Sequence, residues 1–201
     1  MPAHPLNLFF NRLVFKPSLF HFPLLAALAA FLLLLAATPL HADAAIWYVD
    51  ADSPAATPDG ASWATAYPSI QTAIDAAVAA GASETTPAEV WVASGTYTAT
   101  ANNIVTMVQY INLYGGFSGT EIGRDMRNVE NNLTTIDGEN THRCVYAASY
   151  TILDGFALTR GKSSYGGGLY CSDSYPIVKN CSFIANSAEE FIAAIILRYL
   201  F

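Results

Sequence analysis

Apolar and polar positions repeat along the second half of the chain with a spacing of 25 residues. Segment 151–161 (TILDGFALTRG) recurs as segment 176–186 (PIVKNCSFIAN). Apolar residues align with apolar residues at Ile152/Ile177, Leu153/Val178, Phe156/Cys181 and Leu158/Phe183. Gly155 aligns with Asn180, and both residue types tolerate left-handed turn conformations. Such self-similarity is typical of a solenoid, in which each repeat buries its apolar face against its neighbours.

Short runs of β-branched and aromatic residues extend this pattern upstream with uneven spacing. Residues 135–138 (TIDG) match 152–155 (ILDG) at an offset of 17, and the runs 90–95 (VWVASG) and 111–116 (INLYGG) come earlier. Each run ends in Gly, Asp-Gly or Asn, which predicts a strand followed by a tight turn. Units of about 20 residues with two or three short strands predict an all-β fold of the parallel β-helix type. The blades of a β-propeller would need roughly 40 residues each.

The first 44 residues have the pattern of a signal peptide. Arg12 and Lys16 precede an uncharged run of 14 residues at 24–37, and residues 42–44 (ADA) form a small-x-small cleavage pattern. The run is shorter than the about 20 residues needed to span a bilayer as a helix. We therefore predict export with cleavage, and an uncleaved membrane anchor is the alternative.

A strand and a helix are expected between the signal peptide and the repeats. Residues 47–50 (WYVD) are strand-like, Ser69 is placed to cap a helix, and Gly81 is placed to end it. The apolar positions with helical spacing are Ile70, Ala73, Ile74, Ala77 and Val78. Because an open strand stack invites edge-on aggregation, we expect this helix to cap the first repeat. The expected domains are a signal peptide (1–44), a strand with the capping helix (45–88), β-helix coils (89–188) and an atypical apolar tail (189–201).

The repeat pattern stops after Ala188. Residues 189–201 (EEFIAAIILRYLF) contain no turn residues, and their apolar part is too short to span a membrane as a helix. One interpretation is a C-terminal cap, but such a cap should present a polar outer face. The tail therefore favours a short or truncated chain, a fragment that has lost further coils or a C-terminal anchor.

Three segments combine glycine turns with apolar residues: 114–121 (YGGFSGTE), 152–156 (ILDGF) and 166–170 (GGGLY). A fourth segment, 180–188 (NCSFIANSA), has Asn at the turn positions. Together they resemble bacterial right-handed parallel β-helix repeat proteins of the pectin-lyase-like superfamily. The pairing of Gly-Gly-x-aliphatic with Phe-x-x-Asn is also similar to the repeat of chlamydial polymorphic outer-membrane proteins, although Gly168 replaces the usual Ala. The resemblance implies a right-handed β-helix. It implies no single activity, because such domains serve as adhesins, surface-layer components and polysaccharide-degrading enzymes.

The charge of the chain after the signal peptide limits its partners. From Ala45 onward there are 15 acidic and 7 basic side chains, a net charge of −8, and no basic run. This argues against nucleic acid or an anionic membrane as a partner. We expect an extracellular or cell-surface protein that contacts a polysaccharide or a cell-surface glycan, and that meets the membrane only through its signal peptide or a lost anchor. Flat rings able to stack on sugars are Tyr146, Tyr150, Tyr165, Tyr170 and Tyr175.

Charged residues in the repeats are the candidates for catalysis. Asp137, Asp154 and Lys179 occupy equivalent places in the aligned repeats, and Arg160 is nearby in the sequence. The resemblance implies that a β-helix lyase would bind calcium with such Asp residues and remove a proton with Arg or Lys. However, Asp-Gly is a common turn dipeptide that backbone geometry alone explains. The preferred function is therefore a non-catalytic surface module, and the alternatives are a polysaccharide lyase or glycoside hydrolase acting on acidic glycans, or a fragment without independent activity.

Histidine and cysteine give little support for other chemistry. His142 is the only histidine after the signal peptide, so a His-based triad would depend on one residue. Cys144, Cys171 and Cys181 lack the C-x-x-C spacing of a zinc site. Cys171 and Cys181 could form a disulfide, but we favour packing of both in the core. No cofactor is expected unless a lyase binds calcium at Asp137 and Asp154.

Overall fold

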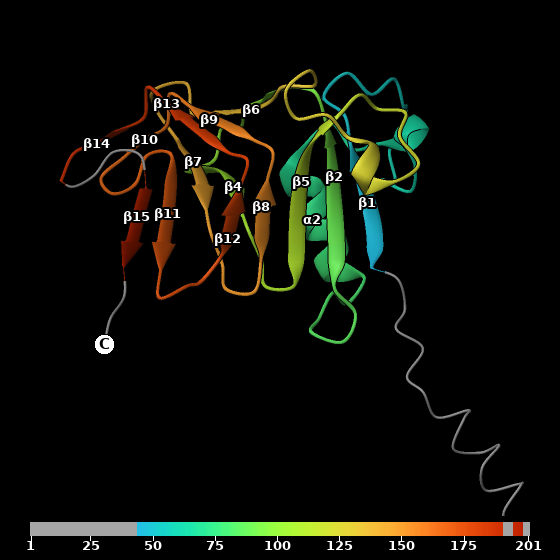
Figure 1. Ribbon diagram of the computed structural model, residues 1–201, viewed down its shortest axis with the longest axis horizontal. Coiled ribbons are helices and arrows are strands. Elements are labelled where there is room, and N and C mark those ends of the chain that lie inside the picture. The colour runs from blue at the N-terminus through green and yellow to red at the C-terminus, as the bar shows by residue number, and fades with distance from the viewer. Residues whose placement is uncertain (1–43, 191–194, 199–201) are drawn as a thin grey trace, which may run out of the picture. The chain divides into compact units, whose positions relative to one another are not determined.

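The computed structural model describes residues 44–190 and 195–198 (Figure 1). In this part of the chain most elements are β-strands, and the strands pair in parallel. One α-helix and two short 3-10 helices, η1 (Trp63–Thr65) and η2 (Arg124–Met126), are its helical elements. The all-β prediction is therefore confirmed at the level of a mostly β chain with parallel sheets.

Sheet 1 has five strands in the order β1-β2-β5-β8-β12, which lie side by side in Figure 1. The strands are β1 (Ala45–Val49), β2 (Ala88–Ala93), β5 (Ile111–Phe117), β8 (Ile152–Asp154) and β12 (Ile177–Lys179). The register places Val90, Leu113 and Leu153 in one row across the sheet, and all three are fully buried. The inward-facing positions of these strands are thus filled by aliphatic side chains that stack from strand to strand.

Two further sheets have four strands each. Sheet 2 consists of β3 (Gly95–Tyr97), β6 (Thr134–Asp137), β9 (Ala157–Thr159) and β13 (Ser182–Ile184). Sheet 3 consists of β4 (Asn103–Thr106), β7 (Arg143–Tyr146), β11 (Leu169–Ser172) and β15 (Ile195–Arg198). A separate pair is formed by β10 (Lys162–Ser163) and β14 (Ser187–Ala188). Leu113 of sheet 1, Ile136 of sheet 2 and Val145 of sheet 3 belong to one buried core.

The strand register confirms the 25-residue repeat and corrects the match of 135–138 with 152–155 that the sequence suggested. Ile152 pairs with Ile177, and Leu158 pairs with Phe183, as the sequence alignment requires. The match at an offset of 17 is wrong, because Asp137 pairs with Thr159 of β9 rather than aligning with Asp154. The sequence alignment failed here because β6 and β8 both end at an Asp that a Gly follows, although the two strands belong to different sheets. A segment without repeat pattern, 118–133, lies between β5 and β6 and lengthens the offset between β5 and β8 to 40 residues, while β6 and β9 are 22 residues apart.

The expected helix is present as α2 (Ile70–Ala79), which contacts β1, β2 and β4. Four of its five predicted apolar positions are buried, but Val78 is 47% exposed and faces away from the core. Ser69 stands at the N-cap position without a side-chain capping hydrogen bond. Gly81 has φ +88°, and backbone bonds from Gly81 N to Val78 O and from Ala82 N to Ala77 O close the helix. This pattern is the Schellman motif expected of a C-terminal glycine.

The ends of the chain are described only in part. The expected signal peptide lies outside the described residues apart from Ala44, and β1 begins at the next residue. In the tail, β15 pairs with β11 in the register Leu169 to Ile195, so a segment without recognisable repeat pattern adds a strand to sheet 3. Within residues 44–190 and 195–198, no helix combines the length and the apolar character needed to cross a membrane.

Candidate functional site

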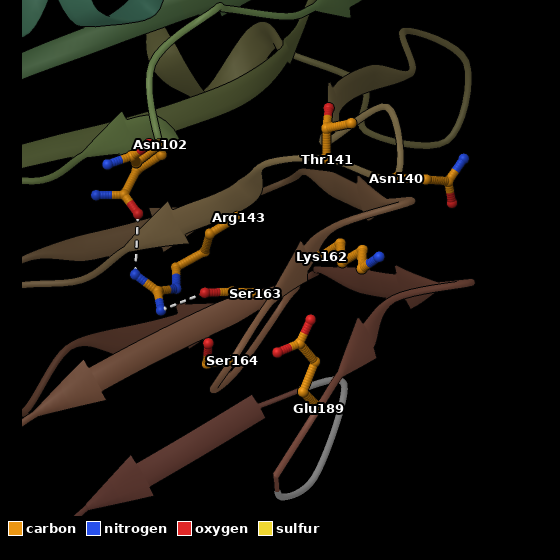
Figure 2. Close-up of a pocket in the computed structure, with 9 residues that line it drawn as sticks. Asn102, Asn140, Thr141, Arg143, Lys162, Ser163, Ser164 and Glu189 are labelled. Atoms are coloured by element: carbon orange, nitrogen blue, oxygen red, sulfur yellow. Dashed lines mark hydrogen bonds between the residues drawn. The ribbon is translucent and has the colours of Figure 1, made fainter.

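A polar cavity of about 510 Å³ lies beside the start of β7 and β10 (Figure 2). Its lining consists of amides, hydroxyls, two cations and one carboxylate, from Asn102, Asn103, Asn140, Thr141, Arg143, Lys162, Ser163, Ser164 and Glu189. Every lining side chain can donate or accept a hydrogen bond. The cavity therefore suits a ligand that is rich in hydroxyl groups or carries charge.

Arg143, the first residue of β7, is fixed by four hydrogen bonds. Its Nε donates to the carbonyl oxygen of Gly166 (3.2 Å), and Nη1 donates to Oδ1 of Asn103 (2.9 Å). Nη2 donates both to Oγ of Ser163 (2.8 Å), as Figure 2 shows, and to the carbonyl oxygen of Tyr165 (2.9 Å). A guanidinium has five N–H donors, so one donor on Nη1 remains for a ligand.

Two tyrosine rings flank this guanidinium. Cζ of Arg143 lies 4.7 Å from the ring centroid of Tyr170 and 5.7 Å from that of Tyr146. The two tyrosines are partners in the register of β7 and β11, so the parallel pairing brings both to the same cation. Burial lowers the pKa of Arg143, and the two tyrosines oppose this effect. The guanidinium stays protonated at neutral pH, because arginine is not deprotonated in proteins.

Lys162 and Glu189 add two exposed charges to the cavity. Neither side chain makes a hydrogen bond or an ion pair with another residue in 44–190, so both can turn toward a ligand. With Arg143 they give the cavity one excess positive charge, although residues 45–201 are acidic as a whole. A carboxylate or sulfate group on a ligand would therefore be favoured here over a cation.

The structure brings together two of the four predicted site residues in sheet 1. Asp154 of β8 and Lys179 of β12 are register partners. Asp154 is 7% exposed, and its carboxylate accepts from Nη2 of Arg127 (2.7 Å) and from Nδ2 of Asn180 (2.8 Å). Both oxygens of Asp154 therefore have protein partners, while Lys179 is exposed.

The predicted row of Asp137, Asp154 and Lys179 is not formed. Asp137 lies on β6 in sheet 2, where Nε and Nη2 of Arg160 and the backbone N–H of Glu139 donate to its carboxylate. Burial would raise the pKa of Asp137, but these hydrogen bonds outweigh burial and hold it below its usual value. The sequence comparison placed Asp137 wrongly because it aligned two Asp-Gly turns that belong to different sheets.

Sequence reasoning missed a second charged cluster on the outer side of sheet 1. Arg124 pairs with Glu89 (2.5 Å), and both Arg124 and Arg127 lie over the ring of Tyr114 at 4.8 and 5.4 Å. Arg124, Arg127 and their neighbours line a cavity of about 300 Å³. The two arginines come from 118–133, the segment without repeat pattern, whose only signal was its length and its basic residues.

The predicted tyrosines divide into two groups. Tyr146, Tyr165 and Tyr170 surround Arg143, with ring centroids 5.5 Å apart for Tyr146 and Tyr170. Tyr150 and Tyr175 are 69% and 65% exposed and lie in the corners that lead into sheet 1. The sequence cluster therefore corresponds to two separate surfaces.

His142 and the three cysteines lie outside the polar cavity lining, and the cysteines pack in or against the core. His142 is partly exposed, and its backbone carbonyl accepts from Lys162 N. All three cysteines are free thiols, with Cys144 and Cys171 buried and Cys181 half-buried against the core. Burial raises the pKa of Cys144 to about 12 and that of Cys171 to about 11.

Metal ligands are not clustered in the described residues. Within 44–190 and 195–198, no group of three or more His, Cys, Asp or Glu side chains is placed to hold a metal ion. Asp137 and Asp154, the candidates for calcium, lie in different sheets, and each is engaged by an arginine. Comparisons of the chain with protein-family models, curated proteins and solved structures gave no match.

Proposed function

We propose that the chain is an exported, non-catalytic surface module that folds as a right-handed parallel β-helix and contacts carbohydrate. Three parallel sheets that receive strands in turn along the chain support the solenoid. The contacts of α2 with β1 and β2 support its role as an N-terminal cap, since β1 is the edge strand of sheet 1. In the solenoid arrangement each coil would bury its apolar face only against its neighbours.

The observation that carries the functional proposal is the polar cavity around Arg143. Sugar recognition requires many hydrogen-bonding groups, and the lining offers amides, hydroxyls and one open N–H of a fixed guanidinium. The positive excess from Arg143 and Lys162 favours a sugar that bears a carboxylate. Because Arg143 is held by its own network, it would lose little conformational entropy on binding.

A non-catalytic role is supported by the state of the candidate acids. Asp137 and Asp154 are each bound by an arginine, so neither carboxylate is free to act as the acid or base of a hydrolase or as a calcium ligand of a lyase. A lyase or hydrolase at Asp154 would first have to displace Arg127 and Asn180. The lyase hypothesis nevertheless predicts cleavage of the oligosaccharide, and an assay for cleavage products distinguishes it from binding alone.

Titration calorimetry of the purified full chain with oligogalacturonate, oligoalginate and neutral xylo-oligosaccharides tests the proposal. We expect saturable binding of an acidic oligomer, weakened about fivefold by Lys162→Ala, because an exposed ion pair with the ligand contributes up to about 1 kcal/mol. Lys179→Ala removes the same charge from an exposed position on sheet 1 and should leave affinity unchanged. Absence of any saccharide binding, or equal losses in both variants, would contradict the proposal.

The same oligosaccharides, with and without calcium, provide the test for turnover. We expect no cleavage products. Turnover that disappears in Asp154→Ala, with the circular dichroism spectrum unchanged, would replace the binding proposal with the lyase or hydrolase. Export is checked separately by cell fractionation and by N-terminal sequencing of the secreted chain, which should begin near Ala45.

A further inference from the structure

Three tyrosines occupy equivalent corners that lead into successive strands of sheet 1. Tyr110 precedes β5, Tyr150 precedes β8, and Tyr175 precedes β12. The separation of Tyr110 and Tyr150 equals the 40-residue offset of β5 and β8, and that of Tyr150 and Tyr175 equals the 25-residue offset of β8 and β12. The backbone N–H of Tyr110 donates to the carbonyl oxygen of Tyr150 (3.2 Å), so neighbouring corners are in direct contact. We call Tyr110, Tyr150 and Tyr175 the tyrosine ladder.

Rings of the ladder stack at the surface. The centroids of Tyr110 and Tyr150 are 5.6 Å apart, and their planes differ by 12°. Despite this contact Tyr150 remains 69% exposed, and Tyr175 is 65% exposed. Burial in the core therefore does not account for Tyr150 and Tyr175, and a large part of each of these two side chains is open to a ligand, whereas Tyr110 is half-buried.

Backbone geometry at two of these positions also disfavours tyrosine. Tyr110 has φ +66° and Tyr150 has φ +58°, a left-handed conformation that is an outlier for a bulky side chain. Of the six other non-glycine residues with positive φ in the described part of the chain, Asn140, Asp173 and Asn180 suit this geometry, whereas Glu139, Arg160 and Ala185 are further exceptions. At Tyr150 this backbone strain coincides with a side chain that is 69% exposed, and core packing does not explain a ring at that position.

The surroundings of the ladder indicate an uncharged ligand. Exposed neighbours before Tyr110 are Val108 and Gln109, and Ser149 precedes Tyr150. The exposed Asp173 lies two residues before Tyr175, and its negative charge disfavours an acidic ligand. The electron-rich face of an aromatic ring attracts polarised C–H groups, and dispersion adds to this attraction. Pyranose sugars present such C–H groups on one face, and phenol hydroxyls can bond the sugar hydroxyls at its edge. Adjacent strands are spaced by about 4.8 Å, so the ladder can meet successive sugars of an extended chain.

We propose that the tyrosine ladder is a stacking surface for neutral pyranose residues of a glycan, separate from the cavity at Arg143. The inference rests on the proposed function for its class of ligand. The two surfaces lie at opposite ends of β7, because Arg143 is its first residue and the corner with Tyr150 follows its last residue, Tyr146. A glycan with charged and neutral sugars could engage both, and each surface can be tested alone.

The experiment uses the full chain with two probes, cellohexaose as a neutral glycan and hexagalacturonate as an acidic one, followed by titration calorimetry and saturation-transfer NMR. We expect the double variant Tyr150→Ala/Tyr175→Ala to bind cellohexaose at least tenfold more weakly and to bind hexagalacturonate as the parent chain does. Tyr150→Phe keeps the ring and should keep cellohexaose binding within about twofold, since only one exposed hydroxyl is lost. Because both positions are exposed, the variants should fold, which circular dichroism checks.

The outcomes separate this inference from the proposed function. If the chain binds hexagalacturonate but not cellohexaose, or if the double alanine variant binds cellohexaose as the parent chain does, the tyrosine ladder is not a stacking surface. Neither result would contradict glycan binding in the cavity at Arg143. Failure of both probes would overturn both. Transfer of saturation to the cellohexaose C–H protons from tyrosine ring protons, lost in the double variant, is the result that supports the ladder.

Discussion

Arg127 donates from Nη2 to Oδ2 of Asp154 at a distance of 2.7 Å, and it joins the segment between β5 and β6 to the outer side of sheet 1. The same guanidinium donates from Nη1 to the carbonyl oxygens of Gly115 (2.9 Å) and Asp154 (3.3 Å). The side chains of Arg127 and Asp154 are 14% and 9% exposed. A pair so well bonded and so little exposed holds a segment in place rather than offering a free acid for catalysis.

Removal of Arg127 should destabilise the protein. Arg127→Ala leaves the carboxylate of Asp154 buried with Asn180 as its remaining side-chain partner, and we expect a loss of about 3 kcal/mol in the free energy of unfolding. Urea unfolding followed by circular dichroism measures this loss. Arg160→Ala is the matched control, because Arg160 is half-exposed and should contribute less to stability. Equal losses in the two variants would contradict this assignment.

Protonation of Asp137 should lower the free energy of unfolding at acidic pH. Its pKa in the folded protein is below the ordinary value of 3.8, so its contribution is complete above that value and is lost as the pH falls through the folded pKa. We therefore expect the free energy of unfolding to decrease between about pH 5 and pH 2. Asp137→Asn should show a smaller decrease over this range in urea unfolding at several pH values. An unchanged pH profile in this variant would count against the role of Asp137.

Close backbone approach should make Gly161 intolerant of a side chain. A Cβ at this position would overlap the carbonyl oxygen of Gly167, whereas a Cβ at Gly123 would lie 3.9 Å from its nearest neighbour, in Met126. We expect Gly161→Ala to lower the free energy of unfolding by about 3 kcal/mol and Gly123→Ala to change it by less than about 0.5 kcal/mol. Thermal unfolding by calorimetry compares them. Similar melting temperatures would show that the corner at Gly161 relaxes easily.

The three thiols should be unreactive in the folded protein. Burial raises the pKa of Cys144 to about 12 and that of Cys171 to about 11, and it also raises the pKa of Cys181. Only the thiolate is nucleophilic, so an aromatic disulfide reagent at neutral pH should label the native chain slowly. Without reductant, the same reagent in concentrated urea should titrate all three thiols. A count of one would instead indicate a disulfide between two of the cysteines.

Local sequence patterns were sufficient to predict several elements of the fold. The period of Ile70, Ala73, Ile74 and Ala77 predicted a helix that the structure contains, and Gly81 ends it as expected. The alignment of 151–161 with 176–186 predicted the register of β8 with β12 and of β9 with β13. These predictions held because helix periodicity and a repeat without insertions depend on neighbouring residues alone.

The candidate site was less accessible from the sequence. Five of the tyrosines later found near Arg143 or in the ladder were noticed, but Arg143 itself was not, since a single arginine carries no pattern. The cavity depends on Asn103 meeting Arg143 across 40 residues, a separation set by the inserted segment 118–133. The same insertion concealed the equivalence of Tyr110 and Tyr150. The wrong placement of Asp137 arose from two similar Asp-Gly turns in different sheets.

The sequence by itself determined the strand-rich character, the helix at 70–79 and the 25-residue repeat, because each arises from the spacing of apolar and turn residues along a short stretch. Only the tertiary structure decided which charges are free. Asp154 and Asp137 look available in the sequence, yet Arg127 and Arg160 engage them, while Lys162 remains exposed beside Arg143. Ion pairs and cavities join residues that the strand register brings together, and the register depends on the lengths of the segments between strands.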